Sequence, residues 1–230
     1  MITGKIELND KEYPERIREI KTAPEVMYYA GDVSALSAEH SVAIIGTRNA
    51  TEEGYMLAKE AGEIAAKLGF VVVNGLAVGI DTASLKGALH AGGRCVVTLP
   101  SGLEDIYPPS NQSLAKEIVD AGGCLLTEYT DGSLEQYRFA QRDRLQSALS
   151  DAVIVIEADE KSGTMITADY AVKFGKPLAC CVSEVLRRNA GGASLVDAGK
   201  AEGLSGIKEI EEYLRKILEM PRFTQMRLDI

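Results

Sequence analysis

Six short apolar runs recur between residues 42 and 182, and segments with helical periodicity separate them. Each run is continuously apolar rather than alternating, which indicates a strand covered on both faces. Buried strands that alternate with helices form a doubly wound parallel sheet with right-handed crossovers. The sequence therefore predicts an α/β fold with strands at 42–46, 70–74, 94–99, 124–128, 152–158 and 177–182.

Two weaker patterns flank this core. In the charged N-terminal segment, Ile17, Ile20 and Met27 can pack a short helix and an extended arm onto the sheet. A glycine-rich stretch after residue 182 leads into a helical pattern, whose apolar stripe can cover a sheet edge or a partner subunit. We expect an N-terminal arm packed on the core, the core itself, and a C-terminal helix with a tail, at 1–40, 41–200 and 201–230.

Composition narrows the classes of function. No stretch reaches the roughly 18–20 apolar residues of a membrane span, and the first residues lack the apolar stretch of a secretory signal, so we expect a cytoplasmic protein without membrane association. The two histidines, His40 and His90, indicate neither a catalytic triad nor a metal site. Four cysteines without metal-ligand spacing lie beside apolar runs and are predicted to be structural and reduced: Cys95, Cys124, Cys180 and Cys181.

The net charge opposes non-specific binding to nucleic acid. The chain has 25 Lys+Arg against 34 Asp+Glu, a net charge of −9, whereas such binders are usually basic. Any site for a polyanion must therefore be local. Screening over about 8 Å makes a local site possible, because distant carboxylates do not reach a cluster of arginines.

The loop after the first predicted strand has the features of an anion site. In open parallel sheets, ligands bind where loops and helix N-termini meet at the carboxyl ends of the strands. Gly46 permits a tight turn before Thr47, Arg48 can bind phosphate, and Thr51 can cap a helix whose first amides are free to attract an anion. The alternative is an ordinary turn with a solvated arginine.

Two further strand-end loops offer backbone amides. Gly75 and Gly79 let the second loop approach a ligand closely, but that loop lacks the lysine of a P-loop, and Asp81 is predicted to cap the next helix. A third turn can cradle a phosphate or simply cap a helix through Ser162, Gly163 and Thr164.

The segment at 137–144 reverses the sign of the chain's average charge. Its arginines, Arg138, Arg142 and Arg144, outnumber Asp143, and Phe139 lies among them. Guanidinium groups can hold phosphates while aromatic faces stack bases, which suits a polynucleotide. The alternative is a solvated helix face paired with nearby acids.

Taken together, these segments resemble motifs of the DprA/Smf family. The family's glycine-serine-arginine motif is similar to residues 46–48, and its SGxAxGID motif to residues 74–81. Its GLDxxYP loop resembles GLEDIYPP at 102–109, its FPxRNRxIxGLS segment resembles FAQRDRLQSALS at 139–150, and its SGSLITA turn resembles SGTMITA at 162–168. The resemblance covers roughly residues 13–200.

The resemblance implies an extended Rossmann-like fold, usually dimeric, that binds single-stranded DNA and helps load a RecA-type recombinase during natural transformation. It implies no covalent chemistry and no cofactor. Arg48, Phe139, Arg142 and Arg144 would contact the DNA. The full set expected to bind DNA or shape its phosphate turns is Gly46, Thr47, Arg48, Thr51, Gly75, Gly79, Phe139, Arg142, Arg144, Ser162, Gly163 and Thr164.

Differences from the family leave two other functions open. Asp143 replaces the family's asparagine between the two arginines, and Val78 stands where the family often has a basic residue. One alternative is a nucleoside monophosphate phosphoribohydrolase with Arg142 and Glu157 in catalytic roles, although the PGGxGT signature of those enzymes is missing. The other is a small-nucleotide sensor that uses the same loops without catalysis.

Overall fold

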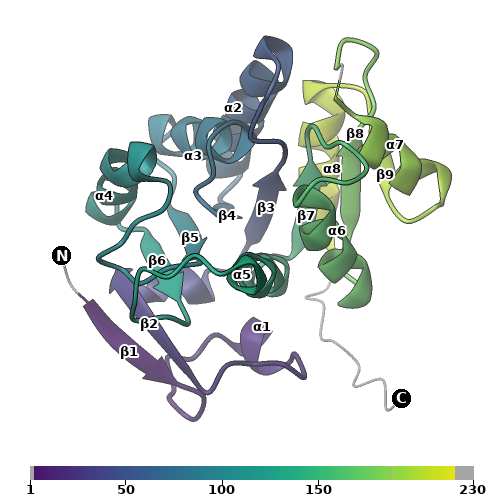
Figure 1. The fold of residues 1–230 in the computed structure, drawn as a ribbon. Helices are drawn as coiled ribbons and strands as arrows, with labels where there is room; N and C mark the ends of the chain where they lie inside the picture. Colours follow the sequence, from purple (N-terminus) through teal and green to yellow (C-terminus); the bar gives the residue numbers. More distant parts are fainter. Residues whose placement is uncertain (1–2, 187, 221–230) are drawn as a thin grey trace.

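The computed structural model describes residues 3–186 and 188–220 of the chain. Within them lies a nine-stranded sheet in the order β1-β2-β6-β5-β4-β3-β7-β8-β9 (Figure 1). The six predicted strands are confirmed and run parallel to one another. They are β3 (Ser41–Ile45), β4 (Val71–Asn74), β5 (Cys95–Leu99), β6 (Cys124–Thr127), β7 (Ala152–Val155) and β8 (Leu178–Cys181).

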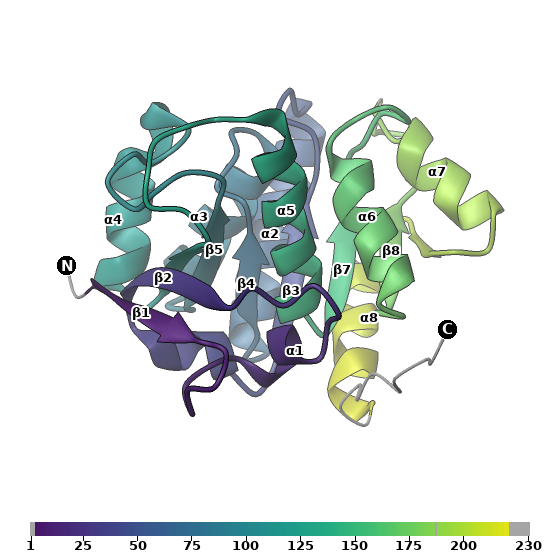
Figure 2. The ribbon, with the colours of Figure 1, turned by 60° about the horizontal axis from the view of Figure 1, so that its bottom comes forward.

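Helices cover both faces of the sheet, as the apolar runs predict. One face packs against α2 (Glu52–Lys67), α3 (Ile80–His90), α4 (Gln112–Asp120) and α8 (Ile207–Glu219). The other packs against α1 (Glu15–Arg18), α5 (Gln136–Leu149), α6 (Thr164–Lys173) and α7 (Ala190–Asp197). Figure 2 looks onto α5 and α6 with the central strands behind them.

The apolar stripe of α8 is buried within the chain itself. Ile210 and Leu214 have no exposed surface and belong to the core cluster beneath α2. The stripe therefore covers the chain's own sheet, one of the two roles that the sequence leaves open for it.

The strand order creates one switch point. The chain adds β4, β5 and β6 on one side of β3 and then returns to place β7 and β8 on the other side. The loops that leave β3 and β7 therefore diverge to opposite faces, and their carboxyl ends frame a crevice. Ligands of doubly wound sheets bind at such a point.

The N-terminal segment continues the sheet. Its hairpin, β1 (Thr3–Glu7) and β2 (Val26–Gly31), joins the edge through antiparallel pairing of β2 with β6. The side chains of Ile17 and Met27 are fully buried, in agreement with the predicted packing of a short helix and an extended arm. A short 3-10 helix, η1 (Val33–Ser37), links the hairpin to β3.

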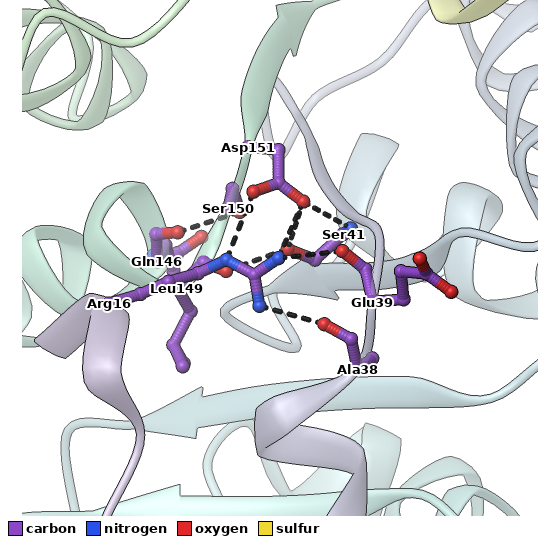
Figure 3. A network of polar contacts seen from close by, with 8 residues as sticks. All are labelled: Arg16, Ala38, Glu39, Ser41, Gln146, Leu149, Ser150 and Asp151. Carbon is purple, nitrogen blue, oxygen red and sulfur yellow. Dashed lines mark hydrogen bonds and ion pairs between the residues drawn. The ribbon is translucent and has the colours of Figure 1, made fainter. Parts of the chain in front are cut away.

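A polar network ties this segment to the core at the amino ends of β3 and β7 (Figure 3). Arg16 donates through Nε and Nη2 to the Asp151 carboxylate, at 3.0 and 2.8 Å, and through Nη1 to the Ala38 carbonyl at 2.9 Å. Asp151 also accepts from the backbone amide of Ser41. These bonds join α1, β3 and β7 at the end of the sheet opposite the switch point.

The C-terminal part adds two elements that the sequence pattern does not predict, α7 and β9 (Glu202–Leu204). β9 has only three residues, and α7 begins in a glycine-rich stretch where Gly191 would clash with the Ala158 carbonyl if it carried a Cβ. The expected tail lies outside the described residues beyond 220.

The four cysteines are buried and free, as predicted, and no described helix has the length and apolarity to cross a membrane.

Candidate nucleic-acid interface

A groove of about 530 Å³ opens at the switch point. The loops after β3, β4 and β7 and one face of α5 form its walls. We call it the switch groove. It brings together eight of the twelve residues predicted from the sequence, which are Gly46, Thr47, Arg48, Phe139, Arg142, Ser162, Gly163 and Thr164.

Two arginines meet over one aromatic ring in this groove. The guanidinium carbons of Arg48 and Arg142 lie 5.6 and 6.0 Å from the centroid of the Phe139 ring. Arg48 is exposed and forms no ion pair with any described residue. Such cation–π contacts hold the guanidinium groups in place while leaving their N–H donors free for an anion.

Asp143 forms an ion pair with the buried Arg142. Only 6% of Arg142 is exposed, and its Nε lies 3.1 Å from Asp143 Oδ1. That Nε atom forms no hydrogen bond among the described residues. Asp143 also accepts from Gln146 Nε2, and burial raises the pKa of its carboxyl group despite the opposing effect of Arg142. The carboxylate that replaces the family's asparagine therefore orients an arginine.

The two glycines of the second loop support the packing of the site. A Cβ on Gly75 would fall 1.0 Å from Arg142 Nη1, so the arginine occupies the space that any side chain would need. Gly79 has a φ of +83°, and its Cβ would lie 2.4 Å from the Thr47 carbonyl. Both positions require glycine for reasons inside the protein, whether or not a ligand binds.

The expected anion site at the start of α2 is already filled. Thr51 caps the helix as predicted and accepts from the Gly54 amide at 3.0 Å. The carboxylate of Glu157, which is fully buried, accepts from the Thr51 amide at 2.9 Å and from its hydroxyl at 2.7 Å. A carboxyl group of the chain itself thus lies beside the N-cap residue of α2, at the end of the helix where negative charge is favoured.

Asp81 does not cap α3, contrary to the sequence-based expectation. The N-cap position is Gly79, and the Asp81 carboxylate instead accepts from the amides of Gly75 and Ala77, at 3.1 and 3.2 Å. It therefore closes the second loop from inside. Burial raises its pKa to about 6, although Arg142 and the two amides oppose the shift.

The N-terminus of α6 lies at the wall of the switch groove and has no side-chain cap. Its N-cap residue is Gly163, which forms no side-chain cap and has no atom within 4 Å of the position of a Cβ. Ser162 Oγ has no hydrogen-bond partner in the described part of the chain. Unlike α2, this helix presents its first turn to the switch groove without an internal anion.

Arg144 lies outside the groove, which corrects the expectation that it contacts DNA. Only 2% of it is exposed, and its Nη2 donates to both oxygens of Glu128, at 2.7 and 2.8 Å. Arg138 is also turned away and pairs with Asp131 at 2.8 Å. Arg144 lies two residues after Arg142 and so on another side of α5, whereas Arg138 lies one turn before Arg142 and is held by Asp131. Of the three arginines in the basic segment, Arg142 alone lines the groove.

Sequence reasoning missed one part of the site. The loop at 100–108 contributes Pro100, Tyr107 and Pro108 to a hollow that adjoins the switch groove at Phe139. The GLEDIYPP motif contains two of these residues, and it carried the signal that could have placed the loop in the site. In contrast, no group of three or more His, Cys, Asp or Glu residues that could hold a metal occurs in the described ranges.

The fold and the groove define the class of the protein: it is Rossmann-like, with a crevice at the switch point of its sheet. A family model described as DNA recombination-mediator protein A matches residues 5–215. DNA processing protein DprA of Bacillus subtilis is 31% identical over 91% of this chain and 70% of its own. The chain belongs to the DprA/Smf family.

Solved structures agree with this assignment. A structure described as showing the single-stranded DNA binding mode of DNA processing protein A from Helicobacter pylori superimposes with a TM-score of 0.83 at 32% identity, covering 94% of this chain and 96% of that one. Molybdenum cofactor carrier protein from Chlamydomonas reinhardtii, at 19% identity and a TM-score of 0.55, shares the fold. Protein Smf of Synechocystis is 39% identical, but the chain spans only 43% of its length.

Replacing Glu157 by alanine is expected to lower the free energy of unfolding by about 2–4 kcal/mol, because Thr51 loses two buried, charge-assisted hydrogen bonds that join the β3 and β7 loops. Denaturant unfolding measures the change. The matched control is Glu160→Ala, an exposed carboxylate in the neighbouring turn, which should leave stability within about 0.5 kcal/mol. Equal effects of the two substitutions would show that the bonds from Thr51 to Glu157 do not stabilise the fold.

Proposed function

We propose that the switch groove binds the phosphates of single-stranded DNA without catalysing a reaction. The observation that carries the proposal is the pair of guanidinium groups, Arg48 and Arg142, held against Phe139 beside the open N-terminus of α6. A charged groove lined with an aromatic ring is the usual arrangement for an unpaired strand. The Helicobacter pylori relative, whose description names single-stranded DNA binding, supports the proposal.

The local charge balance is compatible with an acidic chain. Arg48 and Arg142 share the groove with the carboxyl groups of Asp81 and Asp143, and burial raises the pKa of both carboxyl groups. The exposed Arg48 is the cation best placed to meet a phosphate first. Binding should therefore be modest and strongly dependent on salt.

Two other functions find less support. The phosphoribohydrolase alternative needs Glu157 as a catalytic group, but that carboxylate is fully buried at the start of α2. A mononucleotide sensor remains compatible with the volume of the groove. Titration with adenosine monophosphate, followed by chromatography for free adenine, distinguishes both alternatives from DNA binding.

We further propose that the chain acts in the cytoplasm as a homodimer and helps a RecA-type recombinase assemble on the bound strand. The description of the matching family as a recombination mediator supports the recombinase role. The dimer is proposed from the family resemblance, since the apolar stripe of α8 is covered within the chain.

The recombinase proposal predicts that the chain stimulates recombinase ATP hydrolysis on single-stranded DNA coated with a single-strand-binding protein. Arg48→Ala should lose the stimulation, because it no longer holds the strand. Light scattering on the same samples reports the mass of the protein and tests the dimer. A wild-type chain that binds the strand but leaves the hydrolysis rate unchanged would contradict the role.

Arg48→Ala is expected to weaken binding of an oligothymidylate about tenfold at low salt and to reduce the slope of log affinity against log salt by about 0.7, because one phosphate contact is lost. Fluorescence anisotropy measures both quantities. Arg94→Ala is the matched control: it removes the same charge from an exposed position at the amino end of β5. Equal affinities of the two variants would place the DNA site outside the switch groove.

Affinity for oligothymidylate should rise roughly three- to tenfold as the pH falls from 7.5 to 5.5. The pKa of Asp81 lies at about 6, above its ordinary value, so protonation below that pH removes a negative charge beside Arg142. Asp143, also with a raised pKa, acts in the same direction, while neither histidine lines the groove.

The matched variant for this pH effect is Asp81→Asn, which keeps an oxygen to accept from the Gly75 and Ala77 amides. Its affinity should depend less on pH, and at pH 7.5 it should exceed that of the wild type. Affinity that falls on acidification, or an unchanged pH profile in Asp81→Asn, would rule out this carboxyl group as the cause.

A further inference from the structure

Among the described residues that line the switch groove, four side chains carry charge, and their charges cancel. Arg48 and Arg142 supply the positive charges, and the carboxylates of Asp81 and Asp143 supply the negative ones. With both carboxyl groups ionised, the groove therefore holds two cations without any net charge. A ligand with one negative charge and a ligand with two meet very different conditions in such a site.

Asp143 is the carboxylate placed to compensate Arg142. Its Oδ1 atom lies 3.1 Å from Arg142 Nε, and both side chains are buried. The carboxylate of Asp81 is engaged instead by the amides of Gly75 and Ala77. Because little water reaches a buried pair, the charge of Asp143 acts on Arg142 and on any ligand beside it with weak screening.

Gln146 holds this carboxylate from one turn further along α5. Only 2% of Gln146 is exposed, and its Nε2 donates to Asp143 Oδ1 at 2.7 Å. Arg142 and Gln146 both favour the charged form of Asp143, against the effect of burial on its pKa. In the motif FPxRNRxIxGLS these two positions are asparagine and isoleucine, so the charge and its donor occur together in this chain.

The phosphates of nucleic acids differ in charge according to their position. A phosphodiester inside a strand carries one negative charge, whereas a terminal phosphate carries roughly −1.5 to −2 at pH 7. The repulsion from Asp143 is proportional to the charge of the ligand, and the cost of dehydrating an ion also rises steeply with its charge. A groove with balanced charges therefore favours the diester.

We propose that Asp143, held by Gln146, makes the switch groove selective for the singly charged phosphodiester of a strand over the doubly charged phosphate of a mononucleotide or strand end. The inference rests on the proposed binding of single-stranded DNA and names what that site rejects. Asp143 determines the specificity through its charge. Gln146 acts through Asp143 and is a positioning residue.

The test uses two ligands that differ by one methyl group and one charge: thymidine 5′-monophosphate and its methyl ester, which is a diester. Each competes with labelled oligothymidylate in fluorescence anisotropy at pH 8, where the monophosphate is a dianion and Asp81, with a pKa of about 6, is ionised. The wild type should bind the ester roughly threefold more tightly than the monophosphate.

Asp143→Asn should remove this preference. The asparagine keeps an oxygen that can accept from Gln146 but has no charge. Affinity should rise about threefold for the ester and about tenfold for the monophosphate, because the lost repulsion is proportional to the ligand charge. The matched control is Asp197→Asn, which removes the same charge from an exposed position at the end of α7 and should leave the ratio of affinities unchanged.

Gln146→Leu tests the positioning role. It should shift the ratio about twofold in the direction of Asp143→Asn, because the charged form of the carboxyl group loses a stabilising bond. In the Asp143→Asn background, the same substitution should leave the ratio unchanged. A general structural role would not depend on the charge at position 143, and thermal unfolding verifies that each variant is folded.

Equal ratios of affinity in the wild type and Asp143→Asn would overturn the selectivity. So would a wild type that prefers the monophosphate, or one from which the ester at millimolar concentration displaces no oligothymidylate. A shift by Gln146→Leu that persists in the Asp143→Asn background would overturn the role of Gln146. Each of these results leaves the proposed function intact if oligothymidylate still binds through Arg48, whereas a wild type that binds no oligothymidylate would overturn that function itself.

Discussion

The buried carboxylate of Glu157 joins the two halves of the sheet at the point where they diverge. It comes from the loop after β7 and accepts from the amide and hydroxyl of Thr51, the N-cap residue of α2, the helix that follows β3. The amide of Thr47 donates back to the Glu157 carbonyl at 2.7 Å. These three bonds hold the β3 and β7 loops together, and residues of both loops line the switch groove.

The Asp81 carboxylate likewise accepts from backbone amides of the chain, those of Gly75 and Ala77 in the second loop. The proposed phosphate contacts therefore fall to Arg48, Arg142 and the start of α6, which line the switch groove. Aromatic contact with Phe139 positions the two cations, and burial raises the pKa of the Asp81 and Asp143 carboxyl groups next to them.

Phe139 links the two arginines of the groove to the loop at 100–108. Both guanidinium groups lie over its ring, and Tyr107 meets that ring edge-on. Gly75 makes the arrangement possible by leaving room for Arg142. The side chains of the site are therefore positioned by contacts with one another.

The six central strands and their burial follow from the pattern of residues alone, because continuous apolar runs have one stable arrangement between layers of helices. The Thr51 cap and eight of the residues that line the groove follow from the pattern as well, since loops after parallel strands gather at one edge of a sheet. Three further features come from the packing of segments that are distant in the sequence: Glu157 accepts from the N-cap residue of α2, Asp81 closes the second loop, and Arg144 pairs with Glu128 while Arg142 faces the groove. These outcomes depend on which charges meet when distant segments pack, and a linear pattern of residues does not contain those distances.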